Sequence, residues 1–148
     1  MKLITLIMMI ILIGFFKTAM ASGKKDSGAT VKIKKGGAVT AFSKEDGFKL
    51  SDKAVKNLGV TFNVLSGAGP WMIPKSALVR IKHSTGVYRK WDGWITMVLV
   101  KVLKQTKETV TIKSIDLQDQ DKVAITGVPF LRMTEADLNS DTVDSCAH

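Results

Sequence analysis

The side chains near the end of the sequence have types and spacing that could bind a metal ion. Asp144, Cys146 and His148 alternate there. A thiolate and an imidazole are ligands that soft metals such as copper(I) prefer. Cys146 and His148 are therefore candidate metal ligands. Two ligands on a polar tail form no preorganised site, however, and an ordinary tail is the favoured interpretation.

Two further groups invite a metal interpretation. Asp116, Asp119 and Asp121 form a DxxDxD cluster, but it lacks the spacing and the terminal glutamate of a calcium loop, and we interpret it as a polar loop. Methionines could offer thioether sulfur to copper(I), although methionine more often fills gaps in a core; the candidates are Met72, Met97 and Met133. Copper or another soft metal is thus the one cofactor considered, and the main prediction is that the chain has none.

Residues for catalysis are scarce. General acid–base chemistry usually needs a histidine or a perturbed carboxylate in a cleft. His83 falls in a predicted turn, and neither Ser76 nor Ser84 has the context of a nucleophile elbow. The sequence has no glycine-rich phosphate loop. We predict that the protein is not an enzyme.

The first 21 residues have the features of a secretory signal. A positive start at Lys2 precedes an apolar run, Leu3 to Phe16, which is shorter than the roughly 20 residues that a membrane span needs. Ala19-Met20-Ala21 then places small side chains where a signal peptidase cleaves. Residues 1–21 are predicted to be a signal peptide and the protein to be exported to the periplasm or cell envelope. An uncleaved membrane anchor is the alternative, favoured by Lys17.

The chain carries a formal net charge of +9. A basic surface favours anionic partners, and export argues against nucleic acid among them. Residues 22–36 are rich in Gly, Ser and Lys and are interpreted as a flexible basic linker; contact with a membrane surface is the alternative. Cys146 is the single cysteine, so no internal disulfide can form and the fold depends on its core.

Local signals predict a short helix over residues 52–58. Ser51 can cap its start by accepting a backbone N–H, and Gly59 suits the left-handed residue that ends a helix. Ala54, Val55 and Leu58 would form its buried side.

The remaining patterns predict strands. Period-two alternation and turn residues mark them, with Asp92-Gly93 as a strong hairpin turn. The run from Trp94 to Leu103 is apolar on both faces, which predicts one central buried strand, and Thr134 to Asp137 resembles a capped helix start. The other predicted strands are 60–65, 77–82, 87–91, 109–115 and 122–126, with weaker ones at 38–43 and near Val31. The predicted fold is mainly β, a compact antiparallel β-roll or small barrel with one or two short helices over residues 37–138. A polar tail follows at 139–148.

From Pro74 onward the sequence resembles the periplasmic adaptor subunits, or membrane fusion proteins, of tripartite efflux systems. A series of short segments follows the order of that family's motifs, and the segment from Phe48 to Val60 is similar to the start of the heavy-metal resistance-nodulation-division type. The later segments are Ile73–Val79, Val87-Tyr88, Val98–Val102, Val110–Leu117, Asp121–Gly127, Phe130-Leu131 and Glu135–Leu138. No single segment is specific; the ordered series carries the resemblance.

The sequence also departs from that family. Asp116 and Gln120 stand where the family has turn glycines, so we expect a different loop there. Only Ser66 to Met72 joins the two matched regions, where full adaptors have a lipoyl domain and a long α-hairpin. The resemblance therefore implies a truncated adaptor, similar to the membrane-proximal domain.

The resemblance implies a function in docking. The expected function is a non-catalytic protein that docks on an inner-membrane efflux transporter or on a full-length adaptor and supports transmembrane export. The alternative is a periplasmic copper-type metal-binding protein associated with metal efflux. If a docking face exists, the aromatic and arginine character of the matched strands makes four residues its candidates: Arg80, Lys82, Tyr88 and Arg89.

Overall fold

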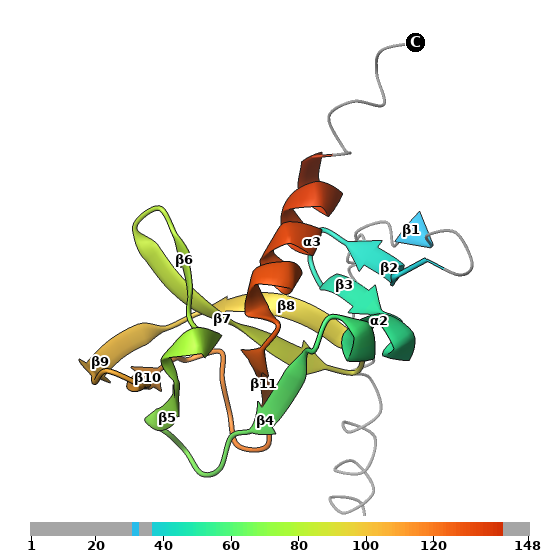
Figure 1. The fold of residues 1–148 in the computed structure, drawn as a ribbon. Coiled ribbons are helices and arrows are strands. Elements are labelled where there is room, and N and C mark those ends of the chain that lie inside the picture. The colour runs from blue at the N-terminus through green and yellow to red at the C-terminus, as the bar shows by residue number, and fades with distance from the viewer. Residues whose placement is uncertain (1–30, 33–36, 141–148) are drawn as a thin grey trace, which may run out of the picture.

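The computed structural model describes residues 31–32 and 37–140, and two antiparallel sheets and two α-helices form most of this region (Figure 1). The larger sheet has eight strands. Seven of them follow the order β1-β2-β3-β8-β7-β11-β4, and the eighth, β6, pairs with β7. Its strands are β1 (Val31–Lys32), β2 (Val39–Ser43), β3 (Gly47–Leu50), β4 (Thr61–Val64), β6 (Val79–Ile81), β7 (Ser84–Trp91), β8 (Trp94–Leu99) and β11 (Lys122–Thr126).

The smaller sheet has three strands in the order β5-β10-β9. They are β5 (Trp71–Pro74), β9 (Lys101–Gln105) and β10 (Thr109–Lys113). Figure 1 shows these three strands gathered at one end of the molecule. The prediction of a mainly β fold is confirmed. The sheets do not close into a barrel, since β1 and β4 end the larger sheet and β5 and β9 end the smaller one.

Two apolar cores lie on opposite sides of β7. Val87 packs in a core shared with the small sheet, which includes Trp71 and Ile112. Tyr88 packs in a second core with Phe48 and Leu131. Neighbouring side chains of a strand point to opposite faces, so one strand supplies both cores. Leu131 belongs to the long helix α3 (Val128–Ser140), which crosses the larger sheet in Figure 1.

The predicted short helix is confirmed as α2 (Asp52–Asn57). Ser51 Oγ accepts a hydrogen bond from the backbone N–H of Ala54 at 3.3 Å, and Gly59 follows with φ +60°. The Asp92-Gly93 hairpin is also confirmed: both residues have positive φ, and Trp91 pairs with Trp94 across the turn.

The prediction of one buried strand from Trp94 to Leu103 is wrong. The chain leaves the larger sheet after Leu99, which pairs with Gly86, and enters the smaller sheet as β9. Val100 lies between them, and its N–H donates to Thr85 O at 2.9 Å. Leu99 and Leu103 are 54% and 48% exposed, so the run is not buried on both faces.

The predicted helix start at Thr134 is also wrong. Helix α3 begins at Val128, directly after Gly127 with its φ of +69°, and Thr134 lies within it, donating to Phe130 O. The start signal is Pro129 in the first turn, and it outweighs the capping pattern at Thr134. Backbone N–H groups in the first turn of a helix have no partner within the helix, so proline, which lacks an N–H, is tolerated there. The remaining helical element of the described residues is a 3-10 turn, η2 (Lys75–Ala77).

Strands and helices extend past both ends of the predicted β domain. β1 lies inside the predicted linker, where a short strand near Val31 was expected, and α3 continues to Ser140. The predicted signal peptide and the last eight residues lie outside the described region. Within that region, no helix combines the length and the apolar character that a membrane crossing requires.

Candidate functional site

The structure separates the four predicted docking residues into two pairs. Arg80 and Lys82 are exposed and lie on the β6–β7 hairpin, which projects from the larger sheet in Figure 1. Lys82 occupies the turn with φ +51°. Both charged side chains are therefore accessible to another protein.

Tyr88 does not belong to an exposed face, so the expectation that it is a surface contact is wrong. Its side chain is buried in the core beneath α3, with its ring at an angle to that of Phe48. The hydroxyl donates to Glu135 Oε2 at 2.8 Å, and Arg132 donates to the same oxygen at 2.9 Å. Burial, together with the Glu135 carboxylate, raises the pKa of Tyr88 far above its usual range. Tyr88 therefore anchors α3 to the sheet.

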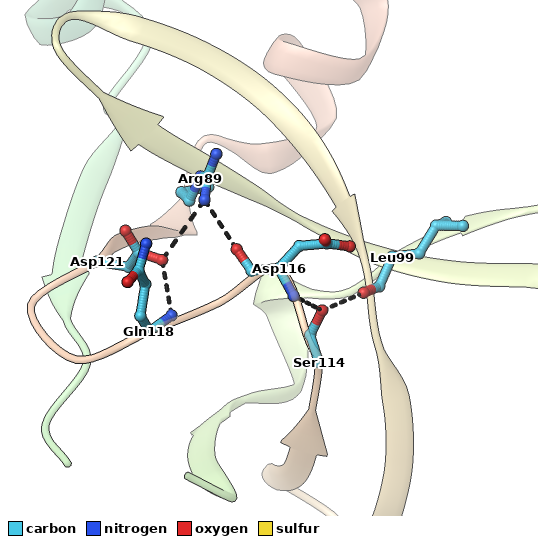
Figure 2. A network of polar contacts seen from close by, with 6 residues as sticks. All are labelled: Arg89, Leu99, Ser114, Asp116, Gln118 and Asp121. Carbon is cyan, nitrogen blue, oxygen red and sulfur yellow. Dashed lines mark hydrogen bonds and ion pairs between the residues drawn. The ribbon is translucent and has the colours of Figure 1, made fainter. Parts of the chain in front are cut away.

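Arg89 is half-buried and points to the opposite side, where it holds a loop (Figure 2). Its Nη1 donates to Asp116 O at 2.8 Å and lies 3.7 Å from Asp121 Oδ2. Its Nε is buried and has no hydrogen-bond partner among the described residues. Because β7 carries Arg89 and the loop joins β10 to β11, this side chain links the two sheets.

The loop from Ser114 to Asp121, called here the aspartate loop, is held in place by several hydrogen bonds. Asp121 is buried, and its carboxylate accepts from the Gln118 N–H at 2.9 Å (Figure 2). Asp119 Oδ1 accepts from the Gly67 N–H at 2.7 Å. Asp116 contributes its backbone carbonyl, and its carboxylate has no partner in the described region. The bonded aspartates thus hold the loop together and attach it to the rest of the chain, which agrees with the interpretation of a polar loop.

No metal centre is found in the described part of the chain. Within it, no group of three or more His, Cys, Asp and Glu side chains converges. Cys146 and His148 lie outside the described residues, so the structure does not bear on that candidate site. Met72 and Met133 are exposed, whereas Met97 packs against the core.

Two hollows lie on the surface of the described residues. One lies beside the start of α2 and includes Lys53 and Asn57. The other lies beside β4 and β5 and includes Trp71 and Met72. Neither is lined by a histidine, a cysteine or a carboxylate.

The most strongly charged surface of the small sheet was not singled out from the sequence. Lys101 lies directly opposite Lys113, and Lys104 lies opposite Thr111, which in turn pairs with Met72 on β5. We call this outer surface of β5-β10-β9, together with Ile115 just after the end of β10, the lysine face. Its residues are all exposed, and those on the strands are Met72, Lys101, Leu103, Lys104 and Lys113. The alternation of side chains along β9 would by itself have placed Lys101 and Leu103 on one face. That face was missed because the run from Trp94 to Leu103 was predicted to be one central, buried strand.

Two lysines of the larger sheet differ from those of the lysine face in having partners. Lys49 Nζ donates to Asp92 O at 2.8 Å and lies 4.7 Å from the centre of the Trp94 ring. Lys90 Nζ lies 5.2 Å from the centre of the Phe62 ring. Over residues 37–140, the ion pairs are those of Arg89 and Arg132, and none involves a lysine.

Comparisons of this chain with protein-family models, curated proteins and solved structures found no match. The resemblance to adaptor subunits therefore stays a prediction from the sequence.

Proposed function

We propose that this protein is a non-catalytic binding module of the cell envelope. It docks on an inner-membrane efflux transporter, or on a full-length adaptor, and supports export by that system. The observation that carries the proposal is the ordered series of adaptor-like segments between Ile73 and Leu138. The secretory character of residues 1–21 supports a location of the protein on the periplasmic side of the inner membrane.

The β6–β7 hairpin supports the proposal with a surface suited to docking. It projects from the sheet, and it carries Arg80 and Lys82 with their charged ends exposed. Arginine is enriched at protein interfaces because its planar guanidinium binds carboxylates in a bidentate manner. Tyr88 and Arg89 contribute indirectly, since they hold the structure from which the hairpin projects.

Site-specific crosslinking in intact envelopes tests this function. A photoreactive phenylalanine derivative would be placed at Arg80 or at Lys82, and captured proteins would be identified by mass spectrometry. Lys53 and Lys56 on α2 are matched control positions, because they are exposed cations away from the hairpin.

We expect the hairpin positions to capture an efflux transporter or an adaptor and the control positions not to do so. Capture of neither from cells that express such pumps would contradict the proposal. Equal capture from both sets of positions would contradict the assignment of the docking surface to the hairpin.

A further inference from the structure

We propose that the lysine face binds the surface of a membrane that contains anionic phospholipids. This proposal does not depend on docking to a transporter, because it concerns another surface and is tested with lipid vesicles alone.

The first observation is uncompensated positive charge. The segments 71–77 and 101–113 contain Lys75, Lys101, Lys104, Lys107 and Lys113 against the single acid Glu108, so their net charge is +5 − 1 = +4. None of these lysines has an ion-pair partner in the part of the chain that the structure describes. The small sheet therefore offers a concentrated positive field to an external anion.

The second observation is the arrangement of that charge. Lys101 and Lys113 are direct cross-strand partners. Like charges directly opposite one another destabilise a sheet, and nothing in the described fold offsets this repulsion. An anionic surface brought against the lysine face would neutralise both ammonium groups together.

The third observation is exposed apolar side chains among the lysines. Ile115 is 97% exposed, Met72 70% and Leu103 48%. Ser114 Oγ donates to Leu99 O at 2.8 Å, which brings the exposed Leu99 beside the residue that follows β10 (Figure 2). Side chains of this kind can enter the boundary between headgroups and acyl chains while neighbouring lysines contact phosphates.

The composition of the lysine face favours lipid over a macromolecule. Protein interfaces are enriched in arginine and aromatic residues and depleted in lysine. Single-stranded nucleic acid binds through stacking on aromatic side chains. The lysine face has neither arginine nor an exposed aromatic residue, since the one aromatic side chain of the small sheet, Trp71, is buried.

Vesicle flotation with the full chain tests this proposal. Phosphatidylcholine vesicles are compared with vesicles that also contain phosphatidylglycerol, and the readout is the ratio of the two partition coefficients. The ratio is needed because the apolar run from Leu3 to Phe16 could bind both kinds of vesicle, independently of lipid charge.

Two triple variants of equal charge provide the comparison. The face variant is K101E/K104E/K113E, and the control variant is K44E/K53E/K56E, whose positions are exposed in the β2–β3 turn and on α2. Each lowers the formal net charge from +9 to 9 − 6 = +3.

For the wild type, we expect the ratio of the two partition coefficients to be well above one. In the face variant this ratio should fall at least about tenfold, because each lysine near an anionic surface contributes strongly to binding. The control variant should keep most of the ratio. Equal losses in both variants, or a wild-type ratio of one, would overturn the proposal. If the face lysines instead govern binding of soluble polyglutamate and not of vesicles, the partner is an acidic protein and the lipid assignment is wrong.

Discussion

The aspartate loop and the lysine face both adjoin β10, and they differ in where their charges find partners. Asp121 and Asp119 accept backbone N–H groups inside the molecule, and Arg89 contacts two aspartates of the same loop. Lys101 and Lys113 face each other and have no acidic partner among the described residues. Charge in the loop is used for folding, whereas charge on the face is left for an external partner.

This contrast shows that a cluster of charged residues does not by itself indicate a site. The three aspartates look more like a ligand set in the sequence than the scattered lysines do. The fold reverses that ranking, because it satisfies the carboxylates locally and brings lysines from two strands to one surface.

The largest expected effect comes from the buried aspartate of the loop. Asp121→Ala should lower the free energy of unfolding by about 3 kcal/mol, because it removes the acceptor of the Gln118 N–H and the ion-pair partner of the half-buried Arg89. Chemical denaturation measures the change.

Two other aspartates of the loop are graded controls for that measurement. Asp119→Ala should cost about 1 kcal/mol, since it removes one exposed hydrogen bond to Gly67. Asp116→Ala should change stability by less than about 0.5 kcal/mol, because its hydrogen bonds are made by its backbone N–H and carbonyl and not by its side chain. Equal effects at the three positions would show that the loop is not held as described.

The next effect concerns the anchor of α3. Tyr88→Phe removes the hydrogen bond to Glu135 and should lower the free energy of unfolding by about 1 kcal/mol at neutral pH. The pKa of Tyr88 is raised in the folded protein, so the folded state retains the phenol proton longer than the unfolded state does. The tyrosine's contribution is therefore complete below its unfolded pKa of about 10 and is lost as the pH rises above it.

Denaturation curves of both proteins between neutral and strongly alkaline pH check this dependence. The two proteins share every other titratable group, so the difference between the two curves isolates Tyr88. A difference that stayed constant above the unfolded pKa of tyrosine would contradict the raised pKa.

The smallest expected effect is a gain in stability on the lysine face. Lys101→Glu places opposite charges across β9 and β10 and should raise the free energy of unfolding by about 0.5 kcal/mol. Lys101→Gln, which only removes the repulsion, should give a smaller gain. Loss of stability in the glutamate variant would indicate that Lys101 has a structural partner after all.

Local signals in the sequence predicted the local features of the fold. The Ser51 cap and Gly59 define α2, and Asp92-Gly93 defines the hairpin between β7 and β8, because the backbone conformations of a few residues determine each of them. At Gln120, where a turn glycine was expected by resemblance, the chain still adopts φ +68°. Gln120 therefore adopts the left-handed backbone conformation of that turn although it is not a glycine.

Features that depend on distant contacts could not be predicted in this way. The break at Val100 arises because β8 and β9 pair with different sheets, and the hydropathy of the run from Trp94 to Leu103 carries no sign of it. The same error concealed the lysine face. Tyr88 was assigned to the surface because strand alternation does not tell which faces a helix such as α3 will cover.

The most direct test measures folding and binding together in the face variant K101E/K104E/K113E. If the lysines of the face serve binding and not folding, its free energy of unfolding will equal or exceed that of the wild type, while its preference for phosphatidylglycerol vesicles is lost. A variant that is destabilised, or one that is stable and still prefers anionic vesicles, would contradict the account.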